Sequence, residues 1–228
     1  MVYAQGSSLH KIPLMRTLED ENPLVHKNRI VYIPGQTAIG LSYDCHEKYI
    51  YWSDVSSNTI NRIREDGSNF SVILNNVKSA EGLAVDWISR NIYFTDSESR
   101  TIEVASLNGL YRKVLIKSHL TNPRGIAVDP IDGYIYWTDW NRKHPKIERS
   151  NMDGTHRRVI VSDDLGVPNG LYFDQKRQEI CWGDAKTKRI ECVEKDGSNR
   201  RVVTQINQMY PFDLTEVRSN IYWSDWSK

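Results

Sequence analysis

The chain has 228 residues, of which 39% are hydrophobic, and its 30 basic and 29 acidic residues leave a formal net charge of +1. This length can bury a substantial core, whereas the balanced charge argues against a binder of nucleic acid or another polyanion, which normally carries a basic surplus on one face. No run of about 18 apolar residues is present, so we expect no membrane insertion. The chain opens directly into strand-like sequence without a signal segment, so we expect either an intracellular protein or a piece of a longer secreted one.

A short motif recurs along the chain: an aromatic pair or its near-equivalent, then a small residue and an aspartate. Its copies begin 42, 43, 45 and 41 positions apart, at Tyr51, Tyr93, Tyr136, Cys181 and Tyr222. A period in the low forties, with about four short strands in each repeat, predicts a β-propeller.

In chain order, residues 1–34 hold three expected strands (Val2–Ala4, Leu9–Leu14 and Arg29–Tyr32) that match the second to fourth strands of a blade. Four complete four-stranded blades follow, over residues 38–75, 80–116, 123–161 and 168–203. Residues 210–228 supply only a first and a second strand. These 21 strands are three short of a six-bladed ring. We therefore expect one all-β domain, a six-bladed propeller with an incomplete ring, and a native protein that continues beyond Lys228.

Each complete repeat has the same internal order. In residues 80–116, Leu83–Val85 begin an apolar strand, Ile92–Asp96 form the motif strand and Thr101–Ser106 alternate as a third. A hairpin turn with positive φ is expected at Asn108-Gly109, and Arg112–Ile116 form a more polar, outermost strand. Turns of this kind recur at Gly67, Gly109, Gly154 and Gly197, and glycines at the first strand recur as Gly40, Gly82, Gly125 and Gly170.

The three cysteines leave two interpretations open. Cys181 and Cys192 lie on neighbouring antiparallel strands, which can bring their side chains close enough for a disulfide. The alternative is two buried free thiols in a cytosolic protein. Cys45 has no obvious partner, and we expect it to be buried and unreactive.

Strand direction sorts the loops onto two faces. The segments that lead into each first strand and those that follow each motif share one face, here called the crossover face; the Asp/Asn-Gly turns share the other, here called the turn face. Around the central axis, the crossover face gathers varied large and charged side chains, which is typical of a recognition surface on a rigid scaffold. The expected partner-binding residues are Asn58, Glu81, Glu98, Arg124, Trp140, Asn169, Tyr210 and Phe212.

The residues give no support for catalysis, a metal or a cofactor. Because an aspartate ends every motif, each is expected to hold its own blade through local hydrogen bonds rather than to form a carboxylate ring. The six histidines lack metal-ligand spacing, and no nucleophile motif is present. An alternative to partner binding is that Glu81 and Arg124 simply form an ion pair with each other. Asn69-Phe70-Ser71 is a glycosylation sequon near the turn face.

The motif and its period resemble the six-bladed YWTD propellers of the low-density lipoprotein receptor superfamily and of the nidogens. Features that favour the nidogen type are Asp44-Cys45, Asn122-Pro123-Arg124-Gly125, the stretch Tyr136–Arg142 with Pro145–Glu148, and Cys181-Trp182 with Glu191-Cys192. Tyr3-Ala4-Gln5 with Ile12-Pro13-Leu14 resembles the start of such a propeller.

This resemblance implies a secreted basement-membrane glycoprotein whose propeller binds an EGF-like module of the laminin γ chain, with other matrix proteins as further candidates. By analogy with the propellers of Wnt co-receptors, Asn169 would receive an asparagine-containing ligand motif and Arg124 an acidic side chain. Asn58 stands where those co-receptors often carry an acid, which is a departure from their pattern.

Two other functions are compatible with the sequence. One is the ectodomain propeller of a receptor for Wnt antagonists or lipoproteins. The other is a calcium-dependent, lactonase-like enzyme, which would need carboxylates that converge on the axis; only Glu81 and Asp213 are expected near it.

Overall fold

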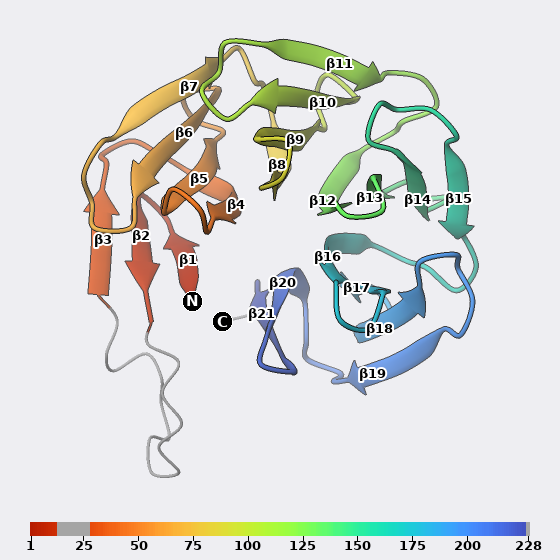
Figure 1. The fold of residues 1–228 in the computed structure, drawn as a ribbon. Helices are drawn as coiled ribbons and strands as arrows, with labels where there is room; N and C mark the ends of the chain where they lie inside the picture. The colour runs from red at the N-terminus through yellow and green to blue at the C-terminus, as the bar shows by residue number, and fades with distance from the viewer. Residues whose placement is uncertain (13–27, 227–228) are drawn as a thin grey trace.

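The computed structural model describes residues 1–12 and 28–226, and this part of the chain consists of 21 β-strands joined by turns and loops (Figure 1). The strands are β1 (Val2–Gln5), β2 (Ser8–Lys11), β3 (Asn28–Tyr32), β4 (Ala38–Asp44), β5 (Tyr49–Asp54), β6 (Thr59–Arg64), β7 (Ser71–Asn75), β8 (Ala80–Asp86), β9 (Asn91–Asp96), β10 (Thr101–Ser106), β11 (Arg112–Ile116), β12 (Pro123–Asp129), β13 (Tyr134–Asp139), β14 (Lys146–Asn151), β15 (Arg158–Val161), β16 (Pro168–Asp174), β17 (Glu179–Asp184), β18 (Arg189–Glu194), β19 (Arg201–Gln205), β20 (Pro211–Val217) and β21 (Asn220–Asp225).

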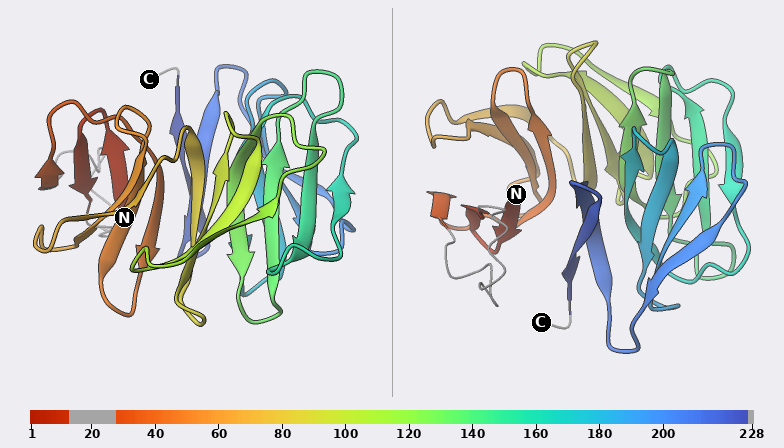
Figure 2. Two further views of the ribbon diagram at one scale, coloured as in Figure 1. Left: turned by 90° about the horizontal axis from the view of Figure 1, so that it is seen from above. Right: turned by 60° about the horizontal axis from the view of Figure 1, so that its bottom comes forward.

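These strands form six antiparallel sheets arranged around a central axis (Figures 1 and 2). Four sheets have four strands, and we call them blades 2 to 5: β4–β7, β8–β11, β12–β15 and β16–β19. Blade 1 has three strands, β1–β3, and blade 6 has two, β20 and β21. The chain is thus a six-bladed YWTD propeller whose ring is incomplete here, and the described strands match the expected number of 21. Of the expected strand Leu9–Leu14, Pro13 and Leu14 lie outside the described residues.

The inner strands approach one another closely at the first-strand glycines. A Cβ atom on Gly125 would lie 2.7 Å from the carbonyl oxygen of Asn169 in the next blade. Because real Cβ contacts are longer than this, only glycine allows the two backbones to lie so close. The third residue of the motif uses this proximity: the Thr138 hydroxyl accepts from the Gly125 N–H (3.0 Å) and donates to the Asn169 carbonyl (2.7 Å).

The motif aspartates of blades 2 to 5 (Asp54, Asp96, Asp139 and Asp184) are buried and hold the backbone of their own blade. Asp139 accepts hydrogen bonds from the N–H groups of Thr121 and Asn122, and Asp184 accepts from those of Gly166 and Val167. These carboxylates therefore have the expected structural role, because they accept hydrogen bonds from N–H groups of their own blade.

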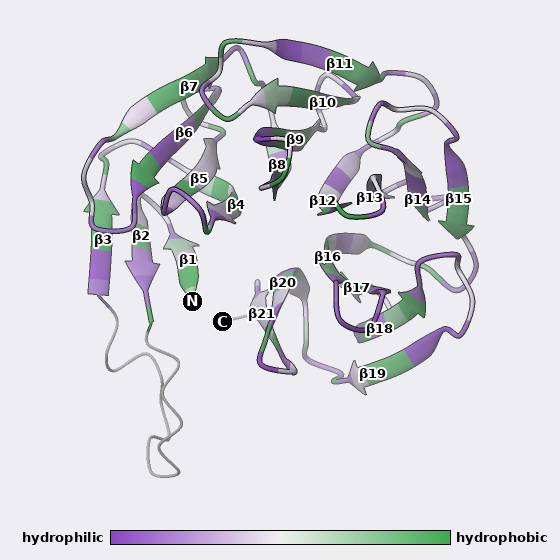
Figure 3. Ribbon diagram, in the orientation of Figure 1, coloured by the Kyte–Doolittle hydropathy of each residue, from purple (hydrophilic) through white to green (hydrophobic). Residues whose placement is uncertain are grey.

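The hydrophobic core lies between blades. Each of five buried clusters in the described chain combines residues from two neighbouring sheets. Trp52, Trp137 and Trp182 are fully buried and pack against the preceding blade. The outer strands β7, β11, β15 and β19 instead mix hydrophilic and hydrophobic residues (Figure 3), as expected for sheet edges that face solvent.

In blades 3, 4 and 5, a buried glutamate on the third strand forms an ion pair with an arginine at or just before the fourth strand. In blade 4, Arg157 donates to buried Glu148 (2.7 Å), covers the Trp137 ring at 5.4 Å and donates to the Ser118 carbonyl of the preceding crossover. Blades 3 and 5 repeat this arrangement with Glu103–Arg112 and Glu191–Arg200.

Blade 2 replaces this ion pair with uncharged residues. Asn61 stands at the glutamate position and Phe70 at the arginine position, with the Phe70 ring 5.9 Å from that of Trp52. The Asn61 side chain is buried without a hydrogen-bond partner. At this position the junction between blades 1 and 2 depends on apolar packing, and the only charged contact between described residues of the two blades is the half-exposed ion pair of Lys11 and Glu65 at 3.7 Å.

Two local expectations are wrong. Positive φ at the Asn-Gly and Asp-Gly turns occurs only at the glycine, as at Gly109 (φ 77°), because the Gly109 N–H closes a tight turn onto the Ser106 carbonyl. Cys45 is exposed rather than buried, since it lies in the short turn after β4 instead of inside the strand.

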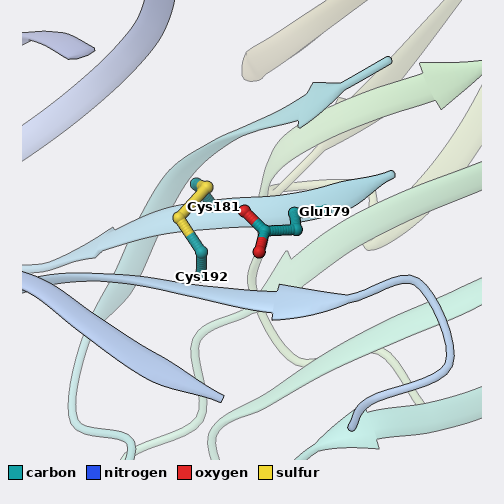
Figure 4. A group of neighbouring side chains, drawn as sticks. All are labelled: Glu179, Cys181 and Cys192. Atoms are coloured by element: carbon teal, nitrogen blue, oxygen red, sulfur yellow. A yellow bond between two sulfur atoms is a disulfide. The ribbon is translucent and has the colours of Figure 1, made fainter. Parts of the chain in front are cut away.

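Cys181 and Cys192 face each other on β17 and β18 and form a disulfide (Figure 4). The Glu179 carboxylate lies beside this bridge and bonds the Arg201 guanidinium at 2.6 Å. Cysteines joined in a disulfide have no thiolate to offer a metal, so this trio is a structural contact.

We expect the double substitution Cys181→Ala/Cys192→Ala to lower the free energy of unfolding by about 3 kcal/mol, because the bridge closes a short loop in the unfolded chain. Urea denaturation followed by circular dichroism measures this. Cys45→Ala is the matched control and should change stability by less than about 0.5 kcal/mol. An equal effect of the two changes would contradict this view of the disulfide.

Candidate functional site

Backbone hydrogen bonds bring the two loop sets of the crossover face together. The residue after each motif donates to the segment that leads into the same blade: Trp140 to Asn122, Ala185 to Val167 and Trp226 to Tyr210. Side chains from separate parts of the repeat therefore meet beside the axis, as the strand directions predict.

A groove of about 420 Å³ opens on this face between blades 4, 5 and 6. Its wall residues are mainly apolar, with an amide and two lysines: Trp140, Val167, Asn169, Ala185, Lys186, Lys188, Tyr210 and Trp226. A larger hollow of about 670 Å³ lies between the outer strands of blade 5 and β21, where blade 6 has no third strand to cover them. The first groove has the apolar walls and few polar groups typical of a recognition site.

Cations lie on the aromatic walls of this groove. The Lys188 Nζ is 2.8 Å from the centre of the Tyr210 ring, and the Arg124 guanidinium is 4.6 Å from that of Trp140. Such contacts hold the aromatic rings in place and put positive charge at the edges of an apolar floor. The groove is therefore suited to a ligand that combines an apolar side chain with an acidic one.

Arg124 also forms an ion pair with Glu81 of the preceding blade. Burial raises the pKa of the Glu81 carboxyl, while Arg124 and the Ser97 hydroxyl act in the opposite direction. The ion pair between Arg124 and Glu81 that the sequence allowed is thus present, but it involves only the Nη1 side of the guanidinium. The other side covers Trp140, so Arg124 links the axis to the groove wall.

Asn169 is buried at the inner end of the groove. Its amide Nδ2 donates to the Pro211 carbonyl at 2.9 Å, which positions the side chain and ties blade 5 to blade 6. Its main-chain carbonyl accepts from the Thr138 hydroxyl of blade 4.

Phe212 and Trp226 stack with ring centres 5.1 Å apart. Next to them, Asp213 takes the position that glycine holds in the four complete blades. Burial raises the pKa of the Asp213 carboxyl to about 6, against the effect of the Leu214 N–H that donates to it.

The remaining expected residues do not line the groove. Asn58 and Glu98 lie on exposed loops of blades 2 and 3, where Glu98 pairs with Lys78 at 3.5 Å. Their role in binding remains a prediction, as does glycosylation of exposed Asn69 after the blade 2 turn. Trp226 was missed by the sequence reasoning. The repeat could have revealed it, because Trp226 follows its motif just as Trp140 does.

Comparison with known proteins places the repeats in a family. The family model of the low-density lipoprotein receptor repeat class B matches residues 48–87, 90–130 and 133–172. The chain belongs to this family. The expected YWTD-propeller resemblance is thereby confirmed.

Two curated relatives are much longer than the chain. Nidogen of Drosophila melanogaster is 43% identical over 209 residues, which are 90% of this chain and 15% of that protein. The vitellogenin receptor Yl of the same organism is 38% identical over 206 residues, 88% of this chain and 10% of the receptor. The chain therefore spans only a small part of either relative.

Among solved structures, a nidogen–laminin complex contains a chain that is 41% identical, with a TM-score of 0.92, covering 99% of this chain and 84% of its own. A gluconolactonase from Xanthomonas campestris is 21% identical with a TM-score of 0.72 over 84% of this chain and 70% of its own. At that identity the second likeness shows the fold alone. In the described part of the chain, no helix is long and apolar enough to span a membrane.

The raised pKa of Asp213 has a consequence for stability. Between about pH 4 and 6 the folded chain binds more protons at this carboxyl than the unfolded chain, so its contribution to stability falls as pH rises through that window. We expect the free energy of unfolding of the wild-type chain to fall relative to that of Asp213→Asn by roughly 2 kcal/mol from pH 4 to pH 7. Urea denaturation at several pH values tests this, and parallel curves for the two chains would contradict it.

Proposed function

We propose that this chain is a non-catalytic, extracellular recognition module that binds laminin through the groove of the crossover face. The main support is the groove itself: aromatic walls, two lysines and the Arg124 guanidinium gather beside the axis. The similarity to a chain of a nidogen–laminin complex, together with the 43% identity to a nidogen, supports laminin as the partner.

The finer proposal is that the ligand is a loop of an EGF-like module of the laminin γ chain. An acidic side chain of that loop would meet Lys188 and the outer side of Arg124. An amide would reach the buried end of the groove at Asn169, and an apolar side chain would pack between Trp140 and Tyr210. Aromatic and arginine residues at the centre of an interface typically carry most of its binding energy.

A secreted, basement-membrane location accompanies this proposal. The Cys181–Cys192 disulfide supports it, because such bridges persist in oxidising compartments. Against an enzyme stand the motif carboxylates, which are used by backbone N–H groups, and Glu81, which is paired with Arg124.

The 38% identity to a vitellogenin receptor favours a second candidate, the propeller of a lipoprotein-type receptor. Binding assays with laminin fragments and with vitellogenin side by side distinguish the two functions. Binding of vitellogenin alone would favour the receptor.

The groove is tested with Tyr210→Ala and Lys188→Ala, measured by surface plasmon resonance on an immobilised laminin γ-chain EGF-like fragment. We expect Tyr210→Ala to weaken binding by about 2 kcal/mol, roughly 30-fold, because it removes a central aromatic wall. Ser57→Ala, on an exposed loop of blade 2, is the control and should change affinity less than about twofold. Unchanged affinity for both groove variants, with native circular dichroism, would overturn the site.

A further inference from the structure

Blade 4 carries an unusual concentration of basic residues on the crossover face. Its two loops there, residues 117–122 and 140–145, contain five basic side chains, all exposed, and no acid: Lys117, His119, Arg142, Lys143 and His144. The corresponding loops of the neighbouring blades differ, because Glu98 offsets Lys78 in blade 3 and Asp163 and Asp164 offset Arg200 and Arg189 in blade 5.

Hydrogen bonds hold the two loops of blade 4 side by side. The Lys146 Nζ donates to the His119 carbonyl at 3.1 Å, and the Asn141 amide donates to the Thr121 hydroxyl at 3.1 Å. Asn141 also caps its own loop, since its Oδ1 accepts from the Lys143 N–H at 2.9 Å. These hydrogen bonds therefore fix the backbone that carries the cationic side chains.

Little of this positive charge is neutralised locally. Buried Glu148 is shared by Lys146 at 3.0 Å and Arg157 at 2.7 Å, and the buried Asp139 carboxylate lies 3.9 Å from Lys146. Lys117, Arg142 and Lys143 form no ion pair with any described residue. Five lysines and arginines against two acids leave a local charge of +3 before the histidines are counted, although the whole chain carries only +1.

We propose that this basic patch (Lys117, Arg142 and Lys143, with His119 and His144 beside them) binds a sulfated glycosaminoglycan. Long, exposed cationic side chains without an apolar centre suit a flexible polymer of sulfate groups better than a folded protein surface, which needs a packed aromatic or aliphatic anchor. Summed charge of this kind attracts polyanions at a range set by the ionic strength. Encounter with such a polymer rests on the proposed extracellular location, whereas none of the patch residues lines the groove.

The patch is tested on the folded chain with immobilised heparin as the probe, by surface plasmon resonance at 50 to 300 mM NaCl. We expect binding that weakens steadily with salt, and a loss of affinity of about tenfold or more in Arg142→Glu/Lys143→Glu. Arg64→Glu/Lys176→Glu is the matched control, because it changes net charge equally at exposed sites of blades 2 and 5, outside the patch. It should retain affinity within about threefold.

The proposal would be overturned by no binding to heparin at 50 mM NaCl, by equal losses in both double variants, or by equal binding to fully desulfated heparin. Competition with polyglutamate of matched charge separates a sulfated polymer from an acidic protein segment, and equal competition would favour the latter and overturn the proposal. Laminin binding by the same variants, measured in parallel, distinguishes failure of this patch from failure of the groove.

Discussion

The close approach of neighbouring inner strands is the constraint on which the rest of the structure depends. At Gly125 the backbones of blades 4 and 5 come too close for any side chain, and the Thr138 hydroxyl bridges them. With the inner ends held in this way, the blades spread outwards and leave wedge-shaped spaces that the buried tryptophans fill. The same contact places the segments before β12 and β16 beside the axis, where the groove residues lie.

Repetition explains why the sequence reveals so much of the fold. Each of the four complete blades repeats the motif, the turn glycine and the first-strand glycine, so the strand boundaries predicted for one blade can be checked against the other three. Single occurrences are harder. Cys45 was expected inside the protein because cysteine is usually buried, yet it lies in the turn that follows Asp44.

The candidate site is less visible in the sequence because it depends on contacts between blades. Arg124 and Asn169 could be placed near the axis from strand direction alone. Their partners could not: the Arg124 guanidinium covers Trp140, and the Asn169 amide bonds a carbonyl 42 residues away. The basic patch was hidden for the same reason, since a whole-chain charge of +1 does not show that one blade gathers the cations.

The uncharged pair in blade 2 distinguishes that blade from its neighbours. Phe70 cannot donate to a crossover carbonyl as Arg112 does, and Asn61 cannot neutralise a guanidinium as Glu103 does. In blades 3, 4 and 5 the arginine also donates to a carbonyl between its own blade and the preceding one, so each ion pair fastens two neighbouring blades together. Blade 2 has no such arginine at this position, and the contact between the Phe70 and Trp52 rings takes its place, so salt and pH should affect this junction less than the next three.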